Sequence, residues 1–184
     1  MKQIADSQAI SIHLTSLAEK LLADCPDASR MIIIGIQRRG AQLGQRLAGI
    51  LSTATGREIP IGILDITFYR DDLSMVDQQP IVRSTEIPIN LDNTYVVLVD
   101  DVIYTGRTAR AALNALVDFG RAQAVRLLVL VDRGWRELPI QPDYIGWKLN
   151  TTRKQVVQVK VTELDGEDGV FLENLKADGV VEAL

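Results

Sequence analysis

The chain has 184 residues, the size of a single domain that can bury a substantial core. Hydrophobic residues make up 47% of it and charged residues 24%, which excludes the disordered and fibrous classes. A net charge of −4 argues against a protein-wide electrostatic footprint for nucleic acid. One cysteine and one histidine are too few for an internal disulfide or a four-ligand zinc site.

Neither a membrane span nor a secretory signal is visible in the sequence. No apolar stretch approaches the roughly 20 residues that a membrane helix needs. Residues 1–30 lack a basic start, an apolar run and a small-residue cleavage site. We therefore expect a cytoplasmic protein without a membrane partner. Because no repeat or linker stands out, residues 1–184 are predicted to form a single domain, with a C-terminal tail from about residue 165.

Helical and strand-like patterns alternate along the chain. Asp6 is suited to cap a first helix, whose apolar face is formed by Ile10, Leu14, Leu17 and Leu21. Apolar or alternating runs predict strands over residues 31–36, 59–69, 95–99, 125–131 and 155–164.

Two further helices are predicted, one after Gly40 and one from about Thr108 to a stop at Gly120. Residues 70–93 are polar and are predicted to form a long excursion. Strands that alternate with helices predict an α/β fold with a parallel sheet covered on both faces. Ligands bind such sheets at the carboxyl ends of the strands. This rule brings together residues 37–40, residues 100–108 and the segment from residue 132 onward.

The segment that joins the strand at 95–99 to the next helix has the chemistry of a sugar-phosphate site. Thr105 and Thr108 offer hydroxyl groups, Gly106 lets a ligand approach the backbone, and the helix start favours an anion. Asp100 and Asp101 can accept hydrogen bonds from vicinal sugar hydroxyls and orient a hydrated Mg²⁺. Together these groups match a ribose 5-phosphate.

The alternative is that one acid merely caps a helix and that Thr-Gly merely forms a turn. The apolar strand before the acids and the Thr-Gly-Arg-Thr loop after them favour the phosphate site. No Gly-Lys-Ser/Thr sequence occurs, so the segment is not a Walker A loop. A Gly-x-Gly-x-x-Gly fingerprint for dinucleotides is also absent from the sequence.

Residues 97–108, Val-Leu-Val-Asp-Asp-Val-Ile-Tyr-Thr-Gly-Arg-Thr, resemble the phosphoribosyl-diphosphate motif of type I phosphoribosyltransferases. Together with residues 65–73 and 131–140 they resemble a narrower family, the pyrimidine-operon regulators that also act as uracil phosphoribosyltransferases. The resemblance runs from about Asp6 to Leu164. It implies the type I phosphoribosyltransferase fold: a central, mostly parallel sheet flanked by helices, with a small hood and a mobile loop.

The resemblance also implies an activity and its partners. The reaction is the conversion of uracil and phosphoribosyl diphosphate to UMP and diphosphate, with Mg²⁺ as cofactor. The regulatory role is control of pyrimidine-biosynthesis genes in response to uridine nucleotides, through the leader mRNA of the operon. A homo-oligomer, a dimer or higher, is expected on the same ground.

The resemblance assigns roles to individual residues. Arg39, Arg70, Asp100 and Asp101 are the expected catalytic residues, and the two acids are also expected to hold Mg²⁺ through water. The residues expected to bind phosphoribosyl diphosphate are Arg38, Arg39, Gly40, Val102, Tyr104, Thr105, Gly106, Arg107 and Thr108. Those expected on the base side, where backbone groups can read the edge of uracil, are Asp132, Arg133, Ile145 and Trp147.

Two of these assignments compete with simpler explanations. Arg38 and Arg39 could form a surface pair, but cations at a helix start face an unfavourable dipole, which favours a bound anion. Arg70 resembles the residue of the mobile loop that stabilises the departing diphosphate. Taken without the resemblance, Arg70-Asp71-Asp72 is typical of a solvated turn.

The sequence departs from the family on the surface that contacts RNA. Residues 1–29 carry only two cationic side chains, Lys2 and Lys20. Positions that are basic in relatives hold Ser11, Ile12, Ser16, Glu19, Trp135 and Trp147. Each change removes a charge that could neutralise a phosphate. RNA binding is therefore left open, and so are two alternatives: a non-catalytic UMP-sensing attenuator, and a phosphoribosyltransferase for another base.

Overall fold

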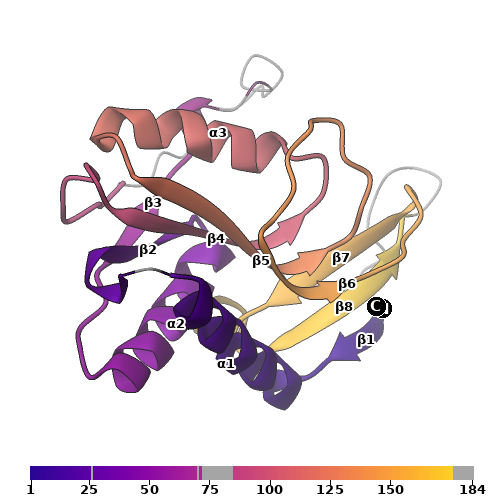
Figure 1. The fold of residues 1–184 in the computed structure, drawn as a ribbon. Coiled ribbons are helices and arrows are strands. Elements are labelled where there is room, and N and C mark those ends of the chain that lie inside the picture. The colour runs from indigo at the N-terminus through magenta and orange to yellow at the C-terminus, as the bar shows by residue number, and fades with distance from the viewer. Residues whose placement is uncertain (26, 70, 72–84, 176–184) are drawn as a thin grey trace.

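The computed structural model describes residues 1–25, 27–69, 71 and 85–175. Its larger sheet has five parallel strands in the order β3-β2-β4-β5-β6 (Figure 1). The strands are β2 (Met31–Ile36), β3 (Ile61–Leu64), β4 (Tyr95–Ile103), β5 (Ala124–Asp132) and β6 (Tyr144–Lys148). The predicted parallel sheet is confirmed. Among the described residues, no helix has both the length and the apolar character needed to span a membrane.

Helices cover both faces of this sheet (Figure 1). One face is covered by α1 (Ser7–Asp24) and α2 (Arg39–Thr55), and the other by α3 (Arg107–Leu116). Short 3₁₀ turns follow α1, β3 and α3, at Ala28–Arg30, Thr67–Tyr69 and Val117–Phe119. This is the three-layer arrangement that alternating strands and helices require, because each helix buries its apolar stripe against the sheet.

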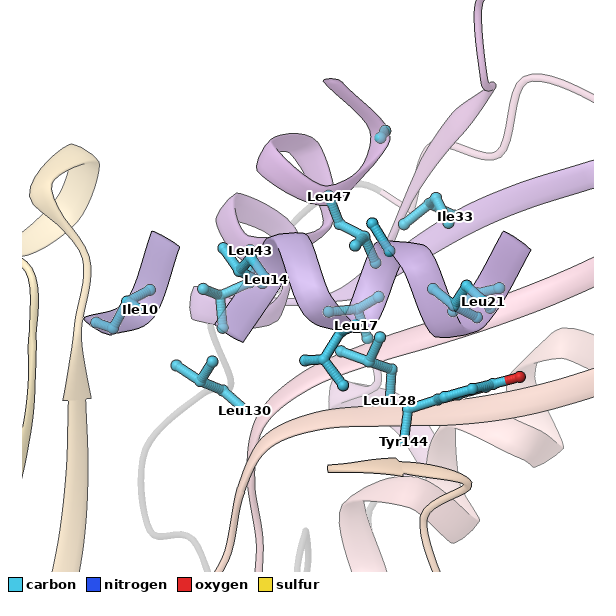
Figure 2. Packing of buried hydrophobic residues seen from close by; sticks show 14 of the residues in the cluster. Ile10, Leu14, Leu17, Leu21, Ile33, Leu43, Leu47, Leu128, Leu130 and Tyr144 are labelled. Atoms are coloured by element: carbon cyan, nitrogen blue, oxygen red, sulfur yellow. The ribbon is translucent and has the colours of Figure 1, made fainter. Parts of the chain in front are cut away.

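The apolar face predicted for the first helix is the one that packs against the sheet (Figure 2). Ile10, Leu14, Leu17 and Leu21 are all at most 2% exposed. They meet α2 and β5 through Leu43, Leu47, Leu128 and Leu130. Burying a side chain of this size contributes about 1.5–3 kcal/mol, so this stripe accounts for much of what holds α1 in place. The predicted cap is also confirmed, because the Asp6 carboxylate accepts a 2.8 Å hydrogen bond from the Ala9 N–H.

A smaller antiparallel sheet lies beside the larger one and contacts it where β7 meets β4 (Figure 1). Its order is β1 (Lys2–Ala5), β8 (Gly169–Asn174) and β7 (Gln155–Lys160), with α4 (Thr162–Asp165) between β7 and β8. We call β1, β7, α4 and β8 the hood. The prediction of a plain tail from about residue 165 is wrong, because β8 is the central strand of the hood.

Three predicted strand ends also differ from the structure. The strand predicted over 155–164 ends at Lys160, because α4 begins at Thr162. The strand predicted to stop at residue 99 continues through Asp100 and Asp101 to Ile103, because β4 keeps pairing with β5 to the end of both strands. The strand predicted over 59–69 ends at Leu64, after which the Asp65 carboxylate accepts the Thr67 N–H at 2.8 Å and starts a turn. Of the predicted excursion at 70–93, residue 70 and residues 72–84 lie outside the described residues.

Candidate active site

The loop between β4 and α3 surrounds a pocket of about 120 Å³. Gly106 precedes α3 with φ of 93°, a conformation that favours glycine. The amides of the first helical turn have no partners within the helix, and together they present a partial positive charge. The pocket is lined by Asp100, Val102, Ile103, Tyr104, Thr105, Gly106, Thr108, Ala109, Leu127 and Val129. The structure thus brings the predicted hydroxyl groups and one of the predicted acids to a single cavity.

Asp100 and Asp101 lie near the carboxyl end of β4 in a poorly solvated environment. Asp100 is 8% exposed, and burial raises its pKa well above the usual range, with the charge of Asp101 adding to the effect. Burial also raises the pKa of Asp101, although hydrogen bonds and the charge of Arg39 oppose this. Two desolvated carboxylates side by side are unfavourable, so hydrogen-bond donors or a cation at this point would stabilise both.

The start of α2 lies against the same end of β4. A Cβ added to Gly40 would be 2.5 Å from the Val99 carbonyl oxygen and 3.1 Å from Asp100 Cα, so only glycine fits there. Gly40 therefore brings the Gln37–Gly40 loop next to the acid pair by close packing. Arg38 is exposed. Arg39 is half-buried, and its guanidinium donates to Asp165 of the hood at 2.7 and 3.0 Å.

The segment after β5 lies over residues 102–108, which include the residues predicted to bind phosphate and which we call the phosphate loop. The Thr105 carbonyl accepts hydrogen bonds from the N–H groups of Glu137 and Leu138, at 2.9 and 3.1 Å. A Cβ on Gly106 would touch Leu138 and Ile140 at 3.5 Å. Residues 137–140 therefore pack directly against this loop.

Arg136 joins these two segments, and sequence reasoning did not select it. Its guanidinium donates to the carbonyls of Tyr104 at 2.9 Å and Ile140 at 3.0 Å, and it forms a 2.8 Å ion pair with Asp132. The arginine and aspartate side chains are only 12% and 13% exposed. The one signal that could have found Arg136 is its place in the 131–140 stretch, since nothing local distinguishes it from a surface arginine.

The predicted base-side residues lie in different surroundings. Arg133 is buried, its guanidinium is 4.0 Å from the centre of the Tyr104 ring, and desolvation lowers its pKa. Ile145 packs against the core cluster on the α3 face of the sheet. Trp147 packs against the opposite cluster, with its ring 4.0 Å from that of His13 on α1.

The phosphate-loop residue Arg107 is exposed and forms ion pairs with Asp71 at 2.6 Å and Glu137 at 3.0 Å. Thr108 is also exposed, whereas Val102, Tyr104 and Thr105 are half-buried. Arg70, the predicted loop arginine, lies outside the described residues.

Residues 1–164 match the family model described as the phosphoribosyl transferase domain. The chain is also 48% identical to the bifunctional protein PyrR of Pelotomaculum thermopropionicum, covering 92% of this chain and 94% of the relative. It is 52% identical to the bifunctional protein PyrR of Deinococcus radiodurans, covering 92% of each. The chain belongs to the PyrR family of phosphoribosyltransferases. The resemblance inferred from the sequence motifs is confirmed.

Solved structures support the fold independently. A hypoxanthine phosphoribosyltransferase from Staphylococcus aureus superposes with a TM-score of 0.69 at 17% identity, covering 96% of this chain and 93% of that one. The hypoxanthine phosphoribosyltransferase of Trypanosoma cruzi gives 0.69 at 13% identity, covering 92% and 89%. At these identities the likeness shows the fold alone, and it confirms the predicted type I phosphoribosyltransferase fold.

Proposed function

We propose that this protein is a uracil phosphoribosyltransferase that also regulates pyrimidine-biosynthesis genes in response to uridine nucleotides. The enzymatic part of the proposal rests on one observation: a carboxylate and a set of phosphate-binding groups line the same pocket. A desolvated carboxylate of the acid pair, Asp100, lies in the same cavity as the hydroxyl and amide groups at the start of α3. A sugar phosphate offers both the hydroxyl donors and the anion that these groups lack.

In the proposed complex, the ribose hydroxyls donate to Asp100 and Asp101, and the 5-phosphate binds between Thr105 and Thr108 at the start of α3. Arg39 binds the diphosphate. The bond from C1 of ribose to the diphosphate oxygen breaks, and its electron pair leaves with the diphosphate. Uracil N1 forms the new bond to C1 and gives up its proton to water. No covalent intermediate with the protein is needed, so catalysis rests on positioning and charge stabilisation.

The acid pair fits the Mg²⁺ that the family resemblance implies. Among the described residues, no cluster of three or more His, Cys, Asp or Glu side chains could form a metal cage. Mg²⁺ usually retains several water ligands and is bound by one or two carboxylates together with substrate phosphates. Two adjacent acids match this coordination preference. When bound, Mg²⁺ would neutralise charge on the diphosphate.

On the base side, we propose that Asp132 and Arg133 form the uracil subsite, and that Ile145 and Trp147, which pack in core clusters on opposite faces of the sheet, support it through the β6 strand. Arg136 and the Gly134 N–H both contact Oδ1 of Asp132, which fixes that carboxylate at the edge of the phosphate loop. A fixed acceptor of this kind suits a planar base that carries N–H groups. The proposed regulatory partner is leader mRNA, bound by a homo-oligomer.

The test of the enzymatic part is direct. Purified protein is mixed with phosphoribosyl diphosphate, Mg²⁺ and labelled uracil, and UMP formation is followed, with hypoxanthine as the competing base. The variant Asp101→Asn is compared with Glu19→Gln, an exposed carboxylate on α1 that serves as the matched control. We expect UMP from the wild type and the control, and a loss of at least about 100-fold in Asp101→Asn. Consumption of hypoxanthine but not uracil would overturn the proposed base. Tight binding of UMP without turnover would overturn the enzymatic activity and show that the protein is a nucleotide sensor.

A further inference from the structure

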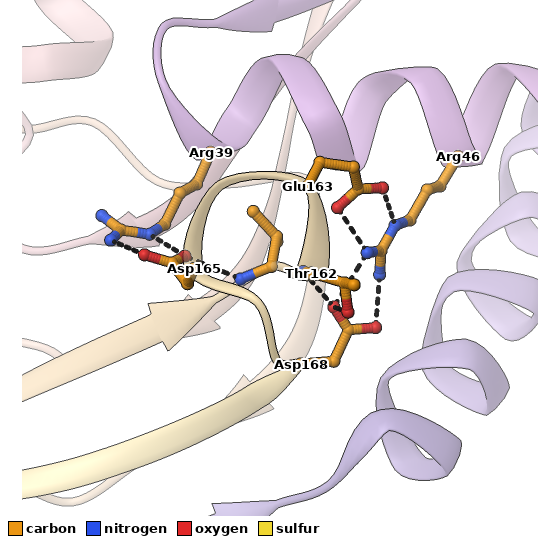
Figure 3. A network of polar contacts seen from close by, with 7 residues as sticks. Arg39, Arg46, Thr162, Glu163, Asp165 and Asp168 are labelled. Atoms are coloured by element: carbon orange, nitrogen blue, oxygen red, sulfur yellow. Dashed lines mark hydrogen bonds and ion pairs between the residues drawn. The ribbon is translucent and has the colours of Figure 1, made fainter.

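Two arginines on one face of α2 hold the short helix of the hood (Figure 3). Arg39 binds Asp165 through two parallel hydrogen bonds, from Nε at 3.0 Å and from Nη2 at 2.7 Å. Two turns further along, Arg46 binds both Glu163 and Asp168, with distances between 2.6 and 2.9 Å. The hood is therefore attached to α2 at two points, and only the first of them involves a residue proposed to bind substrate.

The Arg39–Asp165 pair is a well-fixed unit. The arginine and aspartate side chains are 27% and 16% exposed. The Asp165 carboxylate also accepts the Val161 N–H at 2.9 Å, and the hydrogen bonds from Arg39 are the main cause that lowers its pKa. Because the guanidinium is planar, two parallel bonds along one edge fix its orientation as well as its position.

Arg39 is also close enough to the acid pair to interact with it. Its neighbour Gly40 packs against the backbone of Asp100, and the pKa of Arg39 is raised first by the hydrogen bonds and charge of Asp165 and then by the charge of Asp101. The guanidinium has five N–H groups, and Asp165 occupies one on Nε and one on Nη2. Among the described residues, no hydrogen bond engages the two N–H groups of Nη1, so that side of Arg39 is available to an anion.

We propose that Asp165 is a positioning residue for diphosphate binding; this inference rests on the proposed function of the site. Asp165 holds Arg39 at a fixed place beside the acid pair, with its Nη1 side free for the diphosphate. Without that anchor, the guanidinium is free to pair with Asp101. Such a pair removes the cation that binds the diphosphate and the carboxylate that binds the ribose hydroxyls at the same time.

The second attachment provides a matched control. Glu163 lies on the same helix of the hood as Asp165 and also pairs with an arginine of α2, but it does not contact Arg39. Glu163→Gln therefore weakens the attachment of the hood without changing the anchor of Arg39. Asp165→Asn keeps the size of the side chain and removes the charge that fixes Arg39, and Asp165→Glu keeps the charge but moves it by one methylene group.

The experiment measures binding of phosphoribosyl diphosphate in the presence of Mg²⁺ by calorimetry, without an acceptor base, and then KM and kcat for UMP formation. Asp165→Asn is expected to raise both Kd and KM for phosphoribosyl diphosphate about tenfold, as loss of a supporting partner typically does. The value of kcat and the KM for uracil should stay within about twofold, and Asp165→Glu should lie between the wild type and Asp165→Asn. Glu163→Gln should leave Kd and KM unchanged.

Equal increases in KM in Asp165→Asn and Glu163→Gln would show that attachment of the hood, not the anchoring of Arg39, is what matters, and would overturn the inference. The same holds if Asp165→Asn binds like the wild type. If Asp165→Asn does not fold, wild-type affinity in Asp165→Glu would also overturn it, and a raised Kd in that variant would support it. A wild-type protein that binds no phosphoribosyl diphosphate would instead overturn the proposed function, and this inference with it.

Discussion

Replacing Arg136 by methionine should destabilise the protein through loss of hydrogen bonds at the wall of the phosphate loop. Methionine keeps most of the apolar stem and removes the guanidinium. The carbonyls of Tyr104 and Ile140 then lose a donor, and Asp132 loses its cation. Each buried polar group left without its partner costs about 1–3 kcal/mol. Because the arginine side chain is 12% exposed, water can replace part of what is lost, so we expect a total of about 3 kcal/mol.

The measurement is the free energy of unfolding from denaturant titrations of the wild type and the variant. Arg126→Met is the control, because Arg126 is 42% exposed and lies 3.7 Å from Asp143. Exposed ion pairs contribute little, so the control should lose less than about 1 kcal/mol. Arg136→Met should also raise KM for phosphoribosyl diphosphate, since the Tyr104 carbonyl belongs to the phosphate loop. A loss no larger than in the control would refute the view that Arg136 holds the two segments together.

Three further predictions concern the acid pair, the helix start and the core. Burial raises the pKa of Asp100 in the folded state, so the folded protein binds a proton that the unfolded chain releases, and stability falls as pH rises from the unfolded pKa to the raised one. Asp100→Asn should therefore raise the melting temperature at neutral pH, flatten its dependence on pH and abolish UMP formation; a lower melting temperature would contradict this. Gly40→Ala should cost at least about 2 kcal/mol by overpacking against Val99, measured by denaturant unfolding, and wild-type stability would show that α2 can shift freely. Leu17→Ala should cost about 2–5 kcal/mol in the same assay, and less than about 1 kcal/mol would mean that the site collapses without a cavity.

The sequence was most informative where the structure depends on local periodicity. The apolar stripe of α1 and the fully buried strand β2 follow from spacing and composition, and both are present as predicted. The phosphate loop was also visible, because a strand, two acids and a Thr-Gly turn are contiguous in the chain. The two ends of the chain were less clear. β1 is only four residues long, and it pairs with β8 from the other end of the sequence, so neither strand has a local signal strong enough to reveal the pairing.

Contacts between distant residues were not predictable for a related reason. Arg39 pairs with Asp165, which is 126 residues further along the chain. Arg136 donates a hydrogen bond to Tyr104, which lies 32 residues earlier, on the phosphate loop. The sequence near Arg39 and Arg136 gives no sign of these partners, because the partners come close only in the folded chain. The motifs therefore located the phosphate loop and the acids, whereas the residues that hold these groups in place became visible only in three dimensions.

The arrangement of charge explains why the proposed site suits a magnesium-bound sugar diphosphate. Asp100 and Asp101 are desolvated next to each other, which is unfavourable without a donor or a cation. Arg39 is the nearby cation, but Asp165 holds its guanidinium along one edge and thereby limits how far it can neutralise the pair. In the proposed complex, a magnesium-bound sugar diphosphate would supply hydroxyl donors and a cation to the acids, and an anion to the Nη1 side of Arg39. Such binding would relieve the repulsion between the acids and pair with Arg39 at the same time, and we therefore expect the site to favour this ligand over a simple phosphate.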